Sequence, residues 1–141
     1  MILIDNNQIV IACAFQIIKQ ESELDISMLR HMILNSYRMY RKKFHKKYGE
    51  LVICHDAGNY WRKDIFPNYK ANRKKRMKDS DVDWNDIFDA LNSLREELEE
   101  NLPYKNMKVD RTEADDIIAV LTRMDSPDEE IMIVSSDKDL K

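Results

Sequence analysis

Four short apolar runs recur along the chain, each bounded by polar residues. They are MILID at 1–5, LVICHD at 51–56, YKNMKV at 104–109 and EIMIVSSD at 130–137, the third being the weakest. Apolar runs of this length are typical of strands that are buried on both faces of a sheet. The pattern therefore predicts four strands, and three of them run directly into an aspartate.

The segments between these runs show the longer apolar periodicity of helices. The first is apolar on most sides, whereas later ones carry apolar side chains at helical spacing. Five helices are expected, over residues 7–20, 27–48, 68–78, 81–102 and 112–124. Trp84 and Phe88 fall on the apolar stripe of the fourth helix, so we expect them in the core.

Short polar residues mark where these helices begin and end. Ser27 is the expected N-cap of the second helix, and Gly49 its C-terminal stop. Asn68 is expected to cap the short basic helix. Thr112 with Asp115 resembles a capping box, with Asp in place of Glu.

The alternation of strands and helices predicts the fold class. Strands separated by helices form parallel sheets whose two faces are covered by helices. The chain of 141 residues is long enough to bury one such core. We therefore expect an α/β fold with a parallel sheet flanked by helices, in a single domain.

Composition narrows the class of protein. Apolar residues make up 43% and charged residues 35% of the chain, which favours a helix-rich folded domain over a disordered one. No apolar run approaches the roughly 20 residues of a membrane-spanning helix, so we expect no membrane association. No basic leader is followed by an apolar stretch, so we expect no signal peptide. Cys13 and Cys54 are expected to be core thiols rather than a disulfide or metal site. No catalytic role is expected of His31, His45 or His55.

Acidic residues collect where the predicted strands end or where the helix after the third strand begins. These residues are Asp5, Asp56, Glu113, Asp115, Asp116, Asp137 and Asp139. The carboxyl ends of parallel strands share one edge of the sheet, the edge where ligands bind. We therefore expect the acids to meet there. On a helical wheel Glu113 and Asp116 share one side, and Asp115 lies on the other.

Carboxylates gathered in this way repel one another. Two charges about 4 Å apart cost on the order of 4 kcal/mol at an effective dielectric near 20, so either some are protonated or a cation is present. Oxygen ligands without His or Cys are those of Mg²⁺ or Mn²⁺ rather than zinc. Two such ions can drive phosphodiester hydrolysis. The alternative is a set of helix caps and turn aspartates, with Asp115 as a cap.

Basic residues are concentrated ahead of these acids. The segment from Tyr60 to Lys78 contains eight basic residues and a single acid. A second basic cluster occupies residues 38–47. Aromatic residues interleave with the first cluster. Phosphates bind Lys and Arg, and aromatic rings stack on unpaired bases, so this segment fits a nucleic acid. A solvated charged surface is the alternative.

The order of the motifs LID, VICHD, YWRKD, YKANR, EADD and VSSDKD resembles the 5′ nucleases of the flap-endonuclease superfamily, including their bacteriophage members. The likeness covers nearly the whole chain. It implies a PIN-like, 5′-3′ exonuclease N-terminal (resolvase-like) domain over 1–141. Residues of about 58–80 would form an arch through which a single-stranded 5′ end passes. The basic segment separates this family from PIN-type ribonucleases, which share the carboxylate-edged sheet.

The resemblance also implies roles for single residues. Two Mg²⁺ ions are expected, with Mn²⁺ able to substitute. The residues implied for the first ion are Asp5, Asp56, Glu113 and Asp115, with Asp116 close by. Those implied for the second ion, or for bridging the two ions, are Asp137 and Asp139. The implied nucleic-acid contacts are Arg62, Lys63, Tyr69, Lys70 and Arg73.

The implied substrate is DNA with a 5′ end or flap, or an RNA primer paired to DNA, in the cytoplasm of a phage-infected bacterium. A single-stranded-DNA-binding replication protein is a further implied partner. Family members continue past the SSD-x-D motif into more aspartates and a helix-hairpin-helix region, which this sequence lacks. We therefore expect an incomplete second metal site and a separate C-terminal fragment as partner. The alternatives are an inactive nucleic-acid-binding fragment, half of a split nuclease, and a PIN-like ribonuclease.

Overall fold

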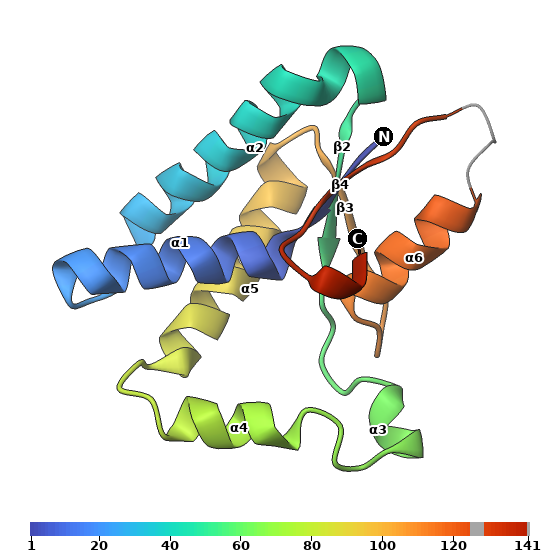
Figure 1. Ribbon diagram of the computed structural model, residues 1–141. Coiled ribbons are helices and arrows are strands. Elements are labelled where there is room, and N and C mark those ends of the chain that lie inside the picture. Colours follow the sequence, from blue (N-terminus) through green and yellow to red (C-terminus); the bar gives the residue numbers. More distant parts are fainter. Residues whose placement is uncertain (125–128, 141) are drawn as a thin grey trace.

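A four-stranded sheet, parallel throughout, forms the centre of the molecule (Figure 1). The computed structural model describes residues 1–124 and 129–140, except the side chains of Lys74 and Asp139. The strand order is β3-β2-β1-β4. The strands are β1 (Ile2–Asp5), β2 (Leu51–His55), β3 (Lys105–Lys108) and β4 (Met132–Val134). The predicted α/β class is confirmed.

Helices cover both faces of the sheet because strand side chains alternate between the faces. Ile2 and Ile4 of β1 point to one face and Leu3 to the other, and each set joins a separate apolar cluster. The helices on the first face are α1 (Asn6–Glu21), α2 (Ile26–Tyr48) and α5 (Trp84–Asn101), and α6 (Ala114–Met124) packs on the second.

Two short helices lie beyond the C-terminal ends of the strands (Figure 1). They are α3 (Arg62–Ile65) and α4 (Ala71–Lys78), both in the connection between β2 and α5. A 3₁₀ turn, η1 (Lys138–Leu140), follows β4 at the same end. The basic segment therefore stands over the sheet edge at which the acids were expected. No helix in the described part of the chain is long and apolar enough to span a membrane.

The helix ends agree with the sequence in part. Gly49 closes α2 with φ of +84°, as predicted, because glycine adopts this conformation without steric cost. The predicted cap Ser27 is wrong: Asp25 caps α2, and its carboxylate accepts from the backbone N–H of Met28 at 3.0 Å. The predicted cap Asn68 is also wrong, because α4 begins only after Lys70, which has φ of +57°.

The prediction that Trp84 and Phe88 belong to the core is wrong for Phe88 and only partly right for Trp84. Phe88 is 39% exposed, and Trp84 is half-buried at the start of α5. The first turns of α5 extend toward α4, past the part of the helix that packs on the sheet (Figure 1). The apolar stripe that is buried further along α5 is therefore open at this end.

A largely buried chain of polar side chains joins four elements, α2, α1, β2 and β3, beneath the sheet edge. The Tyr37 hydroxyl donates to Asn6 Oδ1, and Asn6 Nδ2 lies 3.1 Å from His55 Nδ1. On its other side His55 Nε2 lies 2.9 Å from Asn106 Oδ1. Burial lowers the pKa of His55, so a neutral imidazole accepts from Asn6 and donates to Asn106. This relay ties the ends of β1 and β2, which carry Asp5 and Asp56, to β3.

The two cysteines lie in the core, as predicted. Cys13 and Cys54 are free, buried thiols. His31 lies on the exposed surface of α2, where its Nε2 is 2.8 Å from the Asn35 amide. His45 is half-buried near the end of the same helix, 3.3 Å from Glu50.

Replacing Tyr37 by Phe tests the energetic weight of the relay. The variant leaves the buried Asn6 oxygen without its donor, so we expect a loss of about 1–2 kcal/mol in the free energy of unfolding. Urea denaturation followed by circular dichroism measures it. Tyr40→Phe on the same helix is the matched control, since the Tyr40 hydroxyl has no hydrogen-bond partner among the described residues. Equal losses in both variants would contradict a specific role for the relay.

Candidate metal and nucleic-acid site

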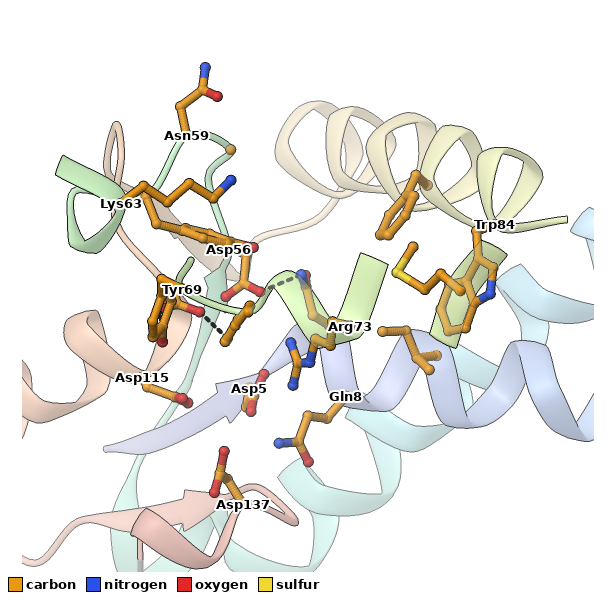
Figure 2. A pocket seen from close by; sticks show the side chains of 18 of the residues that line it. Asp5, Gln8, Asp56, Asn59, Lys63, Tyr69, Arg73, Trp84, Asp115 and Asp137 are labelled. Carbon is orange, nitrogen blue, oxygen red and sulfur yellow. Dashed lines mark hydrogen bonds and ion pairs between the residues drawn. The ribbon is translucent and has the colours of Figure 1, made fainter. Parts of the chain in front are cut away.

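The strand ends deliver carboxylates to one cavity, as the sequence predicts. Asp5 is the last residue of β1, Asp56 follows β2 directly, and Asp137 comes three residues after β4. All three line a cavity of about 570 Å³, together with Glu113 and Asp115 at the start of α6 (Figure 2). The side chain of Asp139 lies outside the described residues, so its predicted place is untested.

Asp56 holds the start of α6 as well as lining the cavity. Its Oδ1 accepts from the backbone N–H of Ala114 at 2.7 Å, and its Oδ2 accepts from the Asn7 amide at 2.8 Å. A backbone bond of 2.8 Å from the Ala57 N–H to the Thr112 carbonyl joins the same two loops. The end of β2 and the start of α6 are therefore fixed to each other.

Asp5 is the most strongly perturbed acid of the cavity. It is 4% exposed, and burial raises its pKa to about 6. The hydrogen bond from the Ser135 hydroxyl, at 3.0 Å, opposes this rise, and the charges of Asp115 and Asp56 add to it. A carboxylate that is hard to ionise beside two others is suited to a bound cation, which would stabilise the charged form.

Asp115 faces the cavity and does not cap α6. Burial raises its pKa, and the charges of Asp137 and Asp56 raise it further, whereas Lys70 opposes the rise. The predicted capping box is wrong, because the Thr112 hydroxyl donates instead to the Asp110 carbonyl at 3.0 Å. The caps at this helix start come from Asp56 and Asp116, the latter accepting from the Glu113 N–H at 3.3 Å.

Glu113 and Asp116 are neutralised by the basic segment. Arg62 donates to Glu113 at 3.0 Å and to both oxygens of Asp116 at 2.7 and 2.6 Å. Lys70 forms an ion pair with Glu113, and the Tyr69 hydroxyl donates to Glu113 at 2.8 Å. The hydrogen bonds from Arg62 lower the pKa of Asp116. Asp116 and Glu113 thus share one side of α6 and Asp115 the other, as the helical wheel predicts.

The donor set is that of a hydrated, hard cation. In the parts of the chain that the structure describes, no three His, Cys, Asp or Glu side chains stand close enough to form a ready-made metal cluster. The acids instead line a shared cavity. The charges of Asp115 and Asp56 raise the pKa of Asp5, and the charge of Asp56 also raises the pKa of Asp115. Mg²⁺ keeps several of its waters and is held by one or two carboxylates directly, so such a spacing suits it.

The five residues predicted to contact nucleic acid, four of them basic, fall into two groups. Arg62, Tyr69 and Lys70 are engaged with Glu113 and Asp116, as described above. Lys63 lies with its Nζ 5.4 Å from the centre of the Tyr60 ring, and Arg73 lines the cavity from α4. Lys63 and Arg73 are the two predicted residues whose charges are not paired with an acid among the described residues.

Several residues in or next to the cavity were not predicted from the sequence. Asn7, Gln8 and Ser135 hold or neighbour the acids: the Asn7 amide donates to Asp56, and Gln8 Oε1 accepts from the Ser136 N–H at 2.8 Å. Their positions within three residues of Asp5 or Asp137 were the available signal. Ile11 and Met77 also line the cavity, and nothing in their local sequence distinguishes them from core residues.

Comparison with protein families identifies one match to the whole chain. Residues 1–141 match the family described as the 5′-3′ exonuclease, N-terminal resolvase-like domain. Ribonuclease H of Enterobacteria phage T4 is 38% identical over 141 residues, covering 97% of this chain and 46% of that protein. Flap endonuclease Xni of Shewanella pealeana is 33% identical over 120 residues, covering 84% and 43%. The expected likeness to the 5′ nucleases, including a bacteriophage member, is therefore confirmed.

A solved structure supports the fold. The T5 D15 protein, in a crystal structure obtained with metal ions, matches with a TM-score of 0.71 over 98% of this chain and 48% of that one. Sequence identity is 16%, so this likeness concerns the fold alone. This chain spans less than half the length of each of these three proteins.

The raised pKa of Asp5 predicts a pH-dependent stability. Folding raises this pKa from 3.8 to about 6, so the folded state holds its proton more tightly, and stability falls as pH rises through that window. Asp5→Asn removes the charge, so we expect it to raise the free energy of unfolding at pH 7.5 by up to about 3 kcal/mol without added metal. At pH 4 the gain should vanish. Urea unfolding at both pH values measures it, and an equal change at both would contradict the assignment.

Proposed function

The chain belongs to the family of the 5′-3′ exonuclease N-terminal, resolvase-like domain, and we propose that it is the metal-binding part of a 5′ nuclease. Its substrate would be DNA with a 5′ end or flap, or an RNA primer paired to DNA. The relatives named ribonuclease H and flap endonuclease support this substrate class. The observation that carries the proposal is one cavity lined by carboxylates from three strand ends and α6, with cations from α4 beside them.

The residues present fit a pair of divalent cations. Asp5, Asp56, Asp115 and Asp137 would hold them, with Glu113 next to them in the cavity. Bound Mg²⁺ supplies a water of lowered pKa and neutralises the leaving oxygen of the phosphodiester. Asp116 has a supporting part, because its pair with Arg62 holds that guanidinium against Glu113. Asp139 remains a predicted ligand from the motif alone.

The basic segment would hold the substrate strand. Lys63 and Arg73 are available for phosphates, and Lys70 at the start of α4 lies within reach of the carboxylates. Residues of about 58–80 would form the arch over the strand. The helices α3 and α4 lie beyond the C-terminal ends of the β-strands (Figure 1). A nucleic-acid strand held by these helices would therefore pass over the carboxylates.

A second function, binding of nucleic acid without cleavage, is favoured by one observation. Lys63 and Arg73 are not paired with an acid among the described residues, so they could bind phosphates whether or not a metal ion is present. A single-stranded-DNA-binding replication protein stays a predicted partner. The phage T4 relative supports the cytoplasm of a phage-infected bacterium as the proposed location.

Metal binding is tested by stability. A cation that binds only the folded chain stabilises it by about 2.7 kcal/mol at 100 times its dissociation constant. We expect Mg²⁺ to raise the urea midpoint, and a chelator to reverse the gain. Asp115→Asn should abolish most of it, whereas Asp89→Asn, an exposed acid on α5, should keep it. A gain of equal size in Asp115→Asn would contradict a site at this cavity.

Catalysis is tested with a labelled 5′-flap DNA, Mg²⁺ and the 141-residue chain. We expect cleavage, reduced at least about 100-fold in Asp115→Asn because the variant removes a carboxylate from the cavity. Asp89→Asn should cleave at the unchanged rate.

Other outcomes of this assay separate the remaining functions. Salt-sensitive binding of the flap without cleavage would favour the non-catalytic role. Faster cleavage of single-stranded RNA than of the flap would favour a PIN-like ribonuclease and contradict the 5′ nuclease.

A further inference from the structure

The cavity that holds the carboxylates has a second, apolar wall. Ile11 of α1, Met77 of α4, and Trp84 and Phe88 of α5 line it together with the acids. In Figure 2 the labelled carboxylates lie on one side of the cavity and Trp84 on the other. Neither the metal ligands nor the phosphate contacts proposed above include these four side chains.

The aromatic side chains of this wall are partly open. The rings of Trp84 and Phe88 have centroids 6.0 Å apart and are tilted by 34°. Phe15 of α1 packs edge-on against Trp84, with the two ring centroids 5.4 Å apart. Phe88 and Phe15 are each 39% exposed. Neighbouring exposed aromatic residues beside a charged cavity are typical of a ligand surface rather than of a packed core.

Unpaired cations stand between the two walls. Arg73 and Arg76 lie one turn apart on α4 and line the cavity, on the helix face that also carries Met77. Neither guanidinium has an ion pair or hydrogen bond among the described residues. In the view of Figure 2 Arg73 lies between the carboxylates and Trp84. From one side to the other, the cavity therefore offers acids, then cations, then apolar rings.

This order matches a ligand that carries phosphates and flat aromatic groups together. We propose that Ile11, Met77, Trp84 and Phe88 form a stacking surface for unpaired nucleobases, with Arg73 and Arg76 on the intervening phosphates. The inference rests on the proposed function and extends it to the bases of the substrate. Bases within a duplex stack on one another, so only unpaired nucleotides present a free face. Stacking tolerates every base, since each has a π face.

A peptide segment fits the same cavity less well. An apolar peptide on Trp84 and Phe88 would cover Arg73 and Arg76 without supplying anions, and burying charges without partners is costly. A single strand supplies the anions and the rings at once. The surface thus selects substrates with unpaired nucleotides near the metal site.

Fluorescence isolates the surface, because Trp61 and Trp84 are the two tryptophans of the chain. In a Trp61→Phe background the emission reports Trp84. We would titrate this protein, with a chelator to prevent cleavage, with an oligothymidylate of about 12 nucleotides and with an abasic oligomer of the same length. We expect the oligothymidylate to quench Trp84 and to bind about tenfold more tightly than the abasic strand.

Matched variants separate bases from phosphates. Phe88→Ala should reduce oligothymidylate binding to the abasic level and leave its salt dependence unchanged, because no phosphate contact is lost. Phe88→Leu keeps an apolar side chain without a ring and should not restore the preference. Arg73→Ala should weaken both strands equally. Val120→Ala, at an apolar residue of α6 that is 53% exposed and does not line the cavity, should change neither.

The outcomes distinguish the two proposals. Equal, salt-sensitive binding of both strands without quenching would overturn the stacking surface and leave the proposed nucleic-acid site standing. Full preference in Phe88→Leu would also overturn stacking. Failure of either strand to bind at low salt would overturn the proposed function, and stacking with it.

Discussion

Repulsion between carboxylates at one edge of the sheet is the constraint on which the rest of the structure depends. The parallel strands bring Asp5, Asp56 and Asp137 to the same edge, and α6 adds Glu113 and Asp115. The chain tolerates part of this charge by pairing and by hydrogen bonds. Arg62 forms ion pairs with Glu113 and Asp116, and Lys70 forms one with Glu113. Asp56 accepts hydrogen bonds from a side-chain amide and from a backbone N–H at the start of α6. Asp5 and Asp115 keep raised pKa values, which makes them the places where a cation gains most.

The scaffold beneath that edge is built to resist this repulsion. The relay from Tyr37 through Asn6 and His55 to Asn106 joins α2, α1, β2 and β3 directly below Asp5 and Asp56. Tyr37, Asn6 and His55 are fully buried and Asn106 is half-buried, and satisfied buried networks hold a single arrangement. Apolar clusters on both faces of the sheet fix the strands laterally. The carboxylates can therefore stay close without the strand ends moving apart.

The segment between β2 and α5 completes the cavity with opposite charge and with rings. Its α3 end neutralises the acids of α6 through Arg62, whereas its α4 end leaves Arg73 and Arg76 available. Beyond α4 the first turns of α5 bring Trp84 and Phe88 to the far wall. One cavity thus combines carboxylates, cationic side chains and exposed aromatic rings. The proposed hydrolysis of a single strand at a metal site would use all three.

The amino-acid sequence by itself determined the strands, the parallel α/β class and the meeting of five acids, Asp5, Asp56, Glu113, Asp115 and Asp137, in one cavity. The metal-binding roles of these acids, of Asp116 and of Asp139 stay predictions. Apolar runs that end in aspartate, and the helical wheel of EADD, depend only on local periodicity and on the shared edge of parallel strands. The tertiary structure decided which charges pair with which. Arg62 and Lys70 were expected on phosphates but lie on carboxylates, because segments more than 40 residues apart meet at the sheet edge. It also decided the caps at Asp25 and Asp56, and it opened Trp84 and Phe88 to the cavity. A helical stripe shows which residues share a face, but only the packing of α5 beyond the sheet determines where along the helix that face is covered.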